Sequence, residues 1–301
     1  MVLFPNTKKI TLVDYKEIEQ FISKFPPYND FEFTSLWTYN TSNRNTYTFL
    51  NDNLVIKIQD FVSGEFFYSF LGTNKVKDTI DILLKKSHEE NIVESLYLVP
   101  EICIRSEQNL SNFYSVNEDP NSFDYILSVS ELSALSGSAY HDKRYMVNKF
   151  LKTYPHHQAV VLDLNLKLVQ DSMIGLFYKW EKQSSKTRNE TQIELTALNK
   201  LFDLTKLNKI TGIGVIINNE LVGFSTYNIV QEKYAIISFE KGDFSFSGIY
   251  EYLKYQTARQ LNNLGCEYIN YEQDLGIPGL RNAKKSWNPK FYLKKYIIKS
   301  M

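Results

Sequence analysis

The sequence predicts an α/β (α+β) protein built from two copies of one unit, each a mixed sheet flanked by helices. The first observation is a repeated order of elements, namely a hairpin, a third strand, a helix and a further strand, once in each half of the chain. The second is the likeness of the two hairpin turns, LNDNLVIKI and IINNELVGF. The third is the aromatic content, 21 Tyr and 20 Phe, which suits the faces of sheets.

In the first half, hydrophobic spacing and turn residues predict each element in turn. An opening helix ends at the pair Pro26-Pro27, and Thr73 or Asn74 caps a later helix. Residues 31–39 fit either a strand or a short helical turn. The expected elements are a helix over 11–25, strands over 46–50, 54–60 and 65–70, a helix through His88, and a strand over 94–99.

The second half repeats this order after two additional helices. Asn218-Asn219 forms the hairpin turn, and Gly265 ends the last long helix as a left-handed cap. The expected elements are helices over 166–182 and 190–204, strands over 210–217, 220–229 and 234–240, a helix over 249–264, and a strand over 266–271.

The repeat predicts three regions: an N-terminal unit over 1–122, a joining segment over 123–157 and a C-terminal unit over 158–301. The joining segment contains the strand-like FDYIL, a helix capped by Ser128 or Ser130, and a helix from His141 to Lys152. The last of these helices has a basic edge that is either a binding surface or a solvated face.

Composition excludes several classes of protein. At 301 residues and a formal net charge of zero, the chain has no overall field that would draw it to nucleic acid or membrane. The two cysteines and four histidines lie in no metal-ligand spacing, so we expect no metal site. No signal peptide or membrane span is expected, and a reducing cytoplasm fits best. Oligomeric state stays open.

Phosphate-loop, nucleophile-elbow and zinc-protease motifs are absent from the sequence. What remains is the junction FEKGD after the third strand of the second half. Glu240 can accept a proton there, while Asp243 and the helix N-terminus at Gly248 can hold a polar or anionic group. These parts predict acyl transfer without a covalent enzyme intermediate. The alternative is that Glu240 merely pairs with Lys241 or Lys233.

A polar run follows the last of these strands, in YINYEQDLGIPGLRNAKKSWNP. Two carboxylates, Glu272 and Asp274, arrive at the strand's end, a glycine-rich bend follows, and Arg281 and Lys284 lie on a short helix. This layout is typical of a site at the exit edge of a sheet. The alternative is a loop whose charges pair with one another.

Two long segments resemble a known family. DYILSVSELSALSGSAYHDKRYMVNKF and YINYEQDLGIPGLRNAKKSWNP are similar to conserved motifs of the DUF2156 family, which is related to the C-terminal domain of phosphatidylglycerol lysyltransferases. The resemblance covers nearly the whole chain and implies two tandem GNAT-like (acyl-CoA N-acyltransferase) units. Tyr145 departs from the first motif. The matching positions are Lys143, Arg144, Asn148, Glu272, Asp274, Gly276, Gly279, Arg281, Lys284 and Ser286.

The resemblance implies aminoacyl transfer from an aminoacyl-tRNA to an amine or hydroxyl acceptor. The catalytic candidates are Glu240, from the FEKGD junction, and Asp274 and Glu272, from the second motif, and the other matching charged and polar positions are substrate-binding candidates. A basic surface from Arg281 to Lys299 is available for tRNA phosphates. An acyl-CoA donor is the alternative, although FSFSGIYEY offers a single glycine for a pyrophosphate. The acceptor is a small molecule or a lipid. A non-catalytic ligand-binding protein is the remaining alternative.

Overall fold

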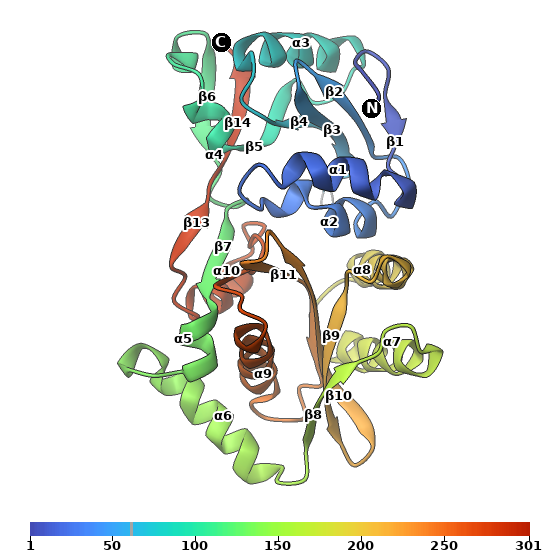
Figure 1. Ribbon diagram of the computed structural model, residues 1–301, viewed down its shortest axis with the longest axis vertical. Helices are drawn as coiled ribbons and strands as arrows, with labels where there is room; N and C mark the ends of the chain where they lie inside the picture. The colour runs from blue at the N-terminus through green and yellow to red at the C-terminus, as the bar shows by residue number, and fades with distance from the viewer. Residues whose placement is uncertain (61–62) are drawn as a thin grey trace. The chain divides into compact units, whose positions relative to one another are not determined.

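The computed structural model describes residues 1–60 and 63–301, and the chain forms two compact units (Figure 1). Unit 1 comprises residues 1–125, 272–283 and 291–301. Unit 2 comprises residues 126–271 and 284–290. The chain therefore leaves unit 1 in its middle and returns to it near the C-terminus.

Unit 1 is built on a seven-stranded mixed sheet. β4 and β5 are parallel, and the other neighbours are antiparallel. In spatial order the strands are β1 (Lys8–Lys9), β2 (Thr46–Leu50), β3 (Asn53–Gln59), β4 (Phe66–Leu71), β5 (Ser95–Pro100), β14 (Lys295–Ser300) and β6 (Tyr114–Glu118). Its helices are α1 (Tyr15–Ile22), α2 (Phe33–Thr38), α3 (Val76–Glu89) and α4 (Glu101–Arg105).

A second seven-stranded mixed sheet organises unit 2. In spatial order its strands are β8 (Gln158–Leu162), β9 (Thr211–Ile217), β10 (Glu220–Val230), β11 (Tyr234–Gly242), β12 (Tyr268–Asn270), β7 (Asp124–Ser128) and β13 (Phe291–Leu293). The helices of unit 2 are α5 (Val129–Ala134), α6 (His141–Thr153), α7 (Lys167–Gln183), α8 (Arg188–Asp203) and α9 (Ile249–Asn263). A further helix, α10 (Pro278–Lys285), belongs to unit 1 over 278–283 and to unit 2 in its last two residues.

The two sheets have the same plan, which confirms the repeat predicted from the sequence. Each has an antiparallel hairpin, a third strand, and a fourth strand parallel to the third that is reached through a helix, α3 or α9. In both sheets the strand next to this fourth strand is antiparallel to it. It is β14 in the first sheet and β7 in the second, and in neither case does it directly follow the fourth strand in sequence.

Local sequence signals account for some element ends, but the predicted cap of α3 is wrong: Lys75, and not Thr73 or Asn74, is at its N-cap. The Ser128 hydroxyl accepts a hydrogen bond from the Glu131 N–H and so caps α5, which decides between the two predicted caps. Gly265 ends α9 with a φ of +80°. Residues 33–38 are helical, which decides the open choice for 31–39. The hydrophobic pattern of the sequence did not predict α4 or the strands β1, β6, β8, β13 and β14. Most of these strands are short or exposed, and they pair with strands that are distant in sequence.

Helices cover both faces of the sheet of unit 2 (Figure 1). α9 packs on one face together with α5 and α6, and α7 and α8 lie on the other. On the α9 face, one hydrophobic core includes Ile249, Leu253, Ile237 and Trp287. β11 lies between these layers, and a bulge in its pairing with β10 puts Ile237 and Glu240 on the α9 face and Lys241 on the face of α7 and α8.

A fully buried lysine ties together distant parts of unit 1. Lys295 on β14 has 0% exposure, and its Nζ lies 2.7 Å from Asp124 Oδ1 and 3.0 Å from Gln273 Oε1. Asp30 forms a second ion pair with it. Asp124 Oδ2 also accepts the Asn29 N–H at 2.9 Å. Burial would lower the pKa of Lys295, but the two carboxylates raise it above its usual value, so the ammonium stays charged.

Replacing Lys295 by Met should destabilise the fold by about 3–5 kcal/mol, because Asp30 and Asp124 would be left buried without a counter-charge. Urea unfolding at neutral pH measures this loss. The matched control is Lys294→Met: this neighbour is 37% exposed and pairs with Glu118 at the surface, so a much smaller loss is expected. Equal losses in the two variants would contradict a special role for the buried group.

Candidate functional site

The candidate site lies where β11 and β12 separate in unit 2. The two strands pair in parallel over Tyr234–Ile236 and Tyr268–Asn270 only, while β11 continues to Gly242. Beyond that pairing the chain after β12 leaves the sheet. Polar side chains gather on both faces of β11 at the end where it pairs with β10 alone.

On the α9 face, Glu240 of β11 forms an ion pair with Lys254 of α9. The Lys254 Nζ lies 2.9 and 2.8 Å from the two carboxylate oxygens of Glu240. The Tyr271 hydroxyl donates to Glu240 Oε1 at 2.9 Å. Tyr271 directly follows β12, so this bond joins the two strands' ends after their backbones have parted.

Two aromatic rings, Tyr271 and Trp287, line this ion pair and are shared by three lysines. Lys254 Nζ lies 3.5 Å from the Tyr271 ring centroid and 5.5 Å from that of Trp287. Lys143 Nζ lies 4.5 Å from the Trp287 centroid, and Lys284 Nζ lies 4.3 Å from the Tyr271 centroid. We call these six residues, Glu240, Lys254, Tyr271, Trp287, Lys143 and Lys284, the β11 cluster.

Burial controls the charge of the β11 cluster. Lys254 is 3% exposed, and desolvation lowers the pKa of its ammonium although the Glu240 carboxylate opposes this shift. Lys254 therefore gives up its proton more readily than a surface lysine. Lys284, 5% exposed, also donates to the Tyr271 carbonyl oxygen, and Lys143 lies 3.6 Å from Glu251 Oε1.

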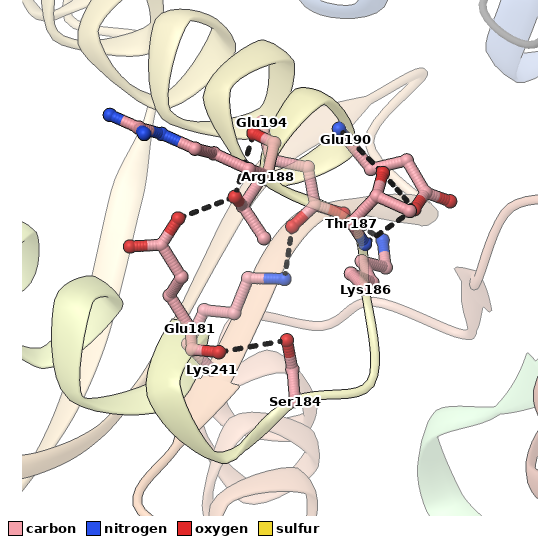
Figure 2. A network of polar contacts seen from close by, with 9 residues as sticks. Glu181, Ser184, Lys186, Thr187, Arg188, Glu190, Glu194 and Lys241 are labelled. Atoms are coloured by element: carbon pink, nitrogen blue, oxygen red, sulfur yellow. Dashed lines mark hydrogen bonds and ion pairs between the residues drawn. The ribbon is translucent and has the colours of Figure 1, made fainter.

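A second network lies on the opposite face of β11, under α7 and α8, and Figure 2 shows it. Lys241 Nζ lies 2.8 Å from Glu194 Oε2 and 3.7 Å from the Trp180 ring centroid. Lys186, from the connection between α7 and α8, pairs with the other oxygen of the same carboxylate. Burial lowers the pKa of Lys241, while the two lysines together hold the pKa of Glu194 below its usual value against the effect of burial.

Local sequence explains why the α7–α8 connection holds this geometry. Thr187 and Glu190 form a capping box at the start of α8: the Thr187 N–H donates to Glu190 Oε2 at 2.7 Å (Figure 2). Thr191 donates to the Glu181 side chain and so links α8 back to α7. The end of β11 thus has ionisable groups held in place on each of its faces.

The next two predicted site residues shape the loop between β11 and α9. Asp243 accepts the Ser245 N–H at 2.9 Å and the Gln183 side-chain amide at 2.9 Å. Burial would raise the pKa of Asp243, but these donors lower it. Gly248 has a φ of +86°, and a Cβ at this position would lie 2.7 Å from the Met146 carbonyl oxygen. α6 therefore covers the N-terminus of α9.

In unit 1, Asp274 and Arg281 bind each other. Arg281 donates from Nε and Nη2 to the two oxygens of Asp274, each at 2.8 Å. The Gly276 N–H and the Tyr125 hydroxyl also donate to Asp274. Glu272 has a φ of +56°, and its carbonyl accepts the Tyr125 N–H at 3.2 Å. These contacts fix the loop that leads into α10.

Three further candidates lie outside the β11 cluster. Arg144 donates to the carbonyls of Leu135 and Gly137, which closes the connection between α5 and α6. Asn148 is exposed on α6, and Ser286 is exposed after α10. Of the predicted site residues, the structure therefore brings Glu240, Lys143 and Lys284 to one pair of rings.

Sequence reasoning missed Lys254, Tyr271 and Trp287. A signal for Lys254 was present, since it lies among apolar residues of α9 that face the core, next to Leu253 and one turn from Ala258. A lysine on such a stripe predicts a buried partner. The equivalent third strand of unit 1, β4, reads FFYSFL and has no acidic or basic residue, so the cluster belongs to the second copy alone.

Comparison with known proteins shows which family the chain resembles. The family model described as "Phosphatidylglycerol lysyltransferase, C-terminal" matches residues 23–299. An uncharacterized protein of Mycoplasmoides gallisepticum is 20% identical over 226 residues, 75% of this chain and 72% of that protein. Within the described residues, no helix is long and apolar enough to cross a bilayer.

Two solved structures share the fold. A conserved protein of unknown function from Bacteroides thetaiotaomicron has a TM-score of 0.84 and 26% identity, covering 100% of both chains. The C-terminal domain (DUF2156) of a putative lysylphosphatidylglycerol synthetase from Agrobacterium fabrum has a TM-score of 0.62 and 11% identity, covering 95% of this chain and 90% of that one. The predicted fold of two tandem GNAT-like units is confirmed.

The Asp274–Arg281 pair makes the free energy of unfolding vary with pH in the acidic range. Burial would raise the pKa of Asp274, but Arg281, Tyr125 and the Gly276 N–H lower it below 3.8. Its contribution is therefore complete above pH 3.8 and is lost as the pH falls through the folded-state value. Asp274→Asn should cost about 1.5–3 kcal/mol at pH 7. The gap from wild type, measured by urea unfolding, should shrink below pH 3.8; a gap constant with pH would contradict this.

Proposed function

We propose that the chain is an acyltransferase, from the premise that it belongs to the phosphatidylglycerol lysyltransferase C-terminal family, whose model spans residues 23–299. The proposed reaction is aminoacyl transfer from an aminoacyl-tRNA to an amine or hydroxyl acceptor. The observation that carries this proposal is the Glu240 carboxylate, 10% exposed and held by Lys254 and Tyr271 where β11 has lost its β12 partner.

The chemistry needs a proton acceptor and no covalent enzyme intermediate. The acceptor's nitrogen or oxygen attacks the ester carbon of the donor, and its proton passes to Glu240. A new amide or ester bond forms, the ester bond to the ribose breaks, and the proton ends on the departing ribose oxygen. Lys254 and the Tyr271 hydroxyl keep the carboxylate in one orientation during this exchange, since both donate to it.

The closed N-terminus of α9 favours tRNA over coenzyme A as the donor carrier. A pyrophosphate at a helix N-terminus needs free N–H groups and open space. Here the Met146 carbonyl abuts Gly248, and the Ile249 N–H donates to the Phe246 carbonyl at 3.1 Å. CoA-dependent N-acetyl transfer is the second candidate, and the GNAT-like order of the strands favours it.

Candidate acceptors are a small molecule and a lipid. The family's name refers to a lipid, phosphatidylglycerol, as the acceptor. Around the β11 cluster, three lysines against Glu240 and Glu251 leave an excess of positive charge near Tyr271 and Trp287. This charge suits an acceptor that has an anionic group near its nucleophile.

Replacing Glu240 by Gln should lower the rate of aminoacyl transfer by about 10²- to 10⁴-fold, because the proton acceptor is lost while the shape is kept. The assay follows a radiolabelled aminoacyl group from a mixed aminoacyl-tRNA pool into lipid and small-molecule fractions of a cell extract. Glu267→Gln, an exposed carboxylate of unit 2 that pairs with Lys233, is the matched control and should keep full activity. Equal activity of the two variants would rule out Glu240 as the base.

Calorimetric titration should distinguish the two donors. Charged tRNA should bind at low salt and weakly at physiological salt, because each phosphate contact adds to the salt dependence. Neutralising Lys285 and Lys290, both exposed, should flatten that dependence, whereas Lys206→Ala, 70% exposed on another element, should not. Micromolar binding of acetyl-CoA without tRNA binding would replace the aminoacyl donor by acyl-CoA and leave acyl transfer intact.

A further inference from the structure

The outer strand of the sheet of unit 2, β8, has an open hydrogen-bonding edge. β8 is antiparallel to β9, from Gln158 opposite Ile216 to Leu162 opposite Gly212, and nothing follows it in the sheet. Among the residues that the structure describes, those of β8 make no hydrogen bond except to β9. Alternate N–H and C=O groups of β8 therefore point away from the sheet without a protein partner.

The other three outer edges of the two sheets have the features that block edge pairing. β1 consists of two lysines, β13 has three residues, and β6 ends in the carboxylate of Glu118. Short length and charge are common ways to protect an edge. β8, with the sequence QAVVL, has five residues and no charge.

The side chains on β8 are also unusual for a solvent edge. Val161 is 58% exposed, and Ala159, on the same face, is exposed as well. Just after the strand, Leu166 and Leu168 are 54% and 80% exposed. An uncharged apolar edge is suited to pair with another strand, and an antiparallel strand pair formed by two identical strands is complementary to itself.

We infer that β8 pairs with β8 of a second copy of this chain, antiparallel and about a two-fold axis at Val160, so that the two seven-stranded sheets become continuous. In this register Val161 of one copy lies opposite Ala159 of the other, a large residue beside a small one on one face. The inference is independent of the proposed acyl transfer. Since a five-residue strand pair is smaller than a standard interface of roughly 1,600 Å², the dimer depends on concentration.

Sedimentation equilibrium tests the association. The wild type should shift from 35.2 kDa to twice that mass as its concentration rises. Val161→Lys places a charge on the edge, so it should remain monomeric under the same conditions. Val13→Lys, the same change at a valine that is 82% exposed in unit 1, should dimerise like wild type. Circular dichroism confirms that both variants are folded.

Cysteine cross-linking tests the register. Val160→Cys should give a disulfide-linked dimer on mild oxidation, because facing Cα atoms in an antiparallel pair lie about 4.5–5.5 Å apart. Val13→Cys should stay monomeric, and the native Cys103 and Cys266 are buried. A wild type that is monomeric at every concentration overturns the inference. So does a dimer that survives Val161→Lys while Val160→Cys fails to cross-link, since the interface would then lie elsewhere.

Discussion

The ion group around Lys295 determines how the chain closes unit 1. One ammonium on the last strand is neutralised by Asp124 and Asp30, two carboxylates that are far from it and from each other in sequence. A buried lysine is stable only when such partners are in place, so the position of β14 depends on Asp124 and on the turn before α2 that contains Asp30. The same group holds Gln273, the residue just before Asp274. The N-terminal region, the middle and the C-terminal strand of the chain therefore depend on one charge.

The two copies of the fold share a strand plan but differ in the charge at the end of their third strand. The first sheet receives its sixth strand, β14, from the C-terminal end of the chain, and the second receives its outer strand β13 from residues 291–293, so neither sheet is completed by one continuous stretch of chain. Yet only the second copy has charge at the end of its third strand, where Glu240 and Lys241 replace the uncharged end of β4. Unit 1 contains the Asp274–Arg281 ion pair, and unit 2 contains the β11 cluster at which we propose the reaction.

The β11 cluster combines features that oppose each other energetically. Lys254 and Glu240 are both desolvated, which is costly, and two aromatic rings and a tyrosine hydroxyl offset part of that cost. On the other face of the same strand, Lys241 and Glu194 repeat the arrangement with Trp180. Buried charge on both faces of one strand end is energetically expensive, and this cost is one reason why we propose the reaction at this place.

The sequence by itself determined the repeated order of elements, most of their bounds, and the family, because hydrophobic spacing and turn residues act over a few residues. It also singled out Glu240, Lys143 and Lys284. The tertiary structure decided what each charge contacts: Asp274 and Arg281 bind each other, Arg144 closes a connection, and α6 covers Gly248. It alone placed β14 and β7, and it alone brought Lys254, Tyr271 and Trp287 together. These contacts join residues that are distant in sequence, and local propensity contains no information about which distant segments meet.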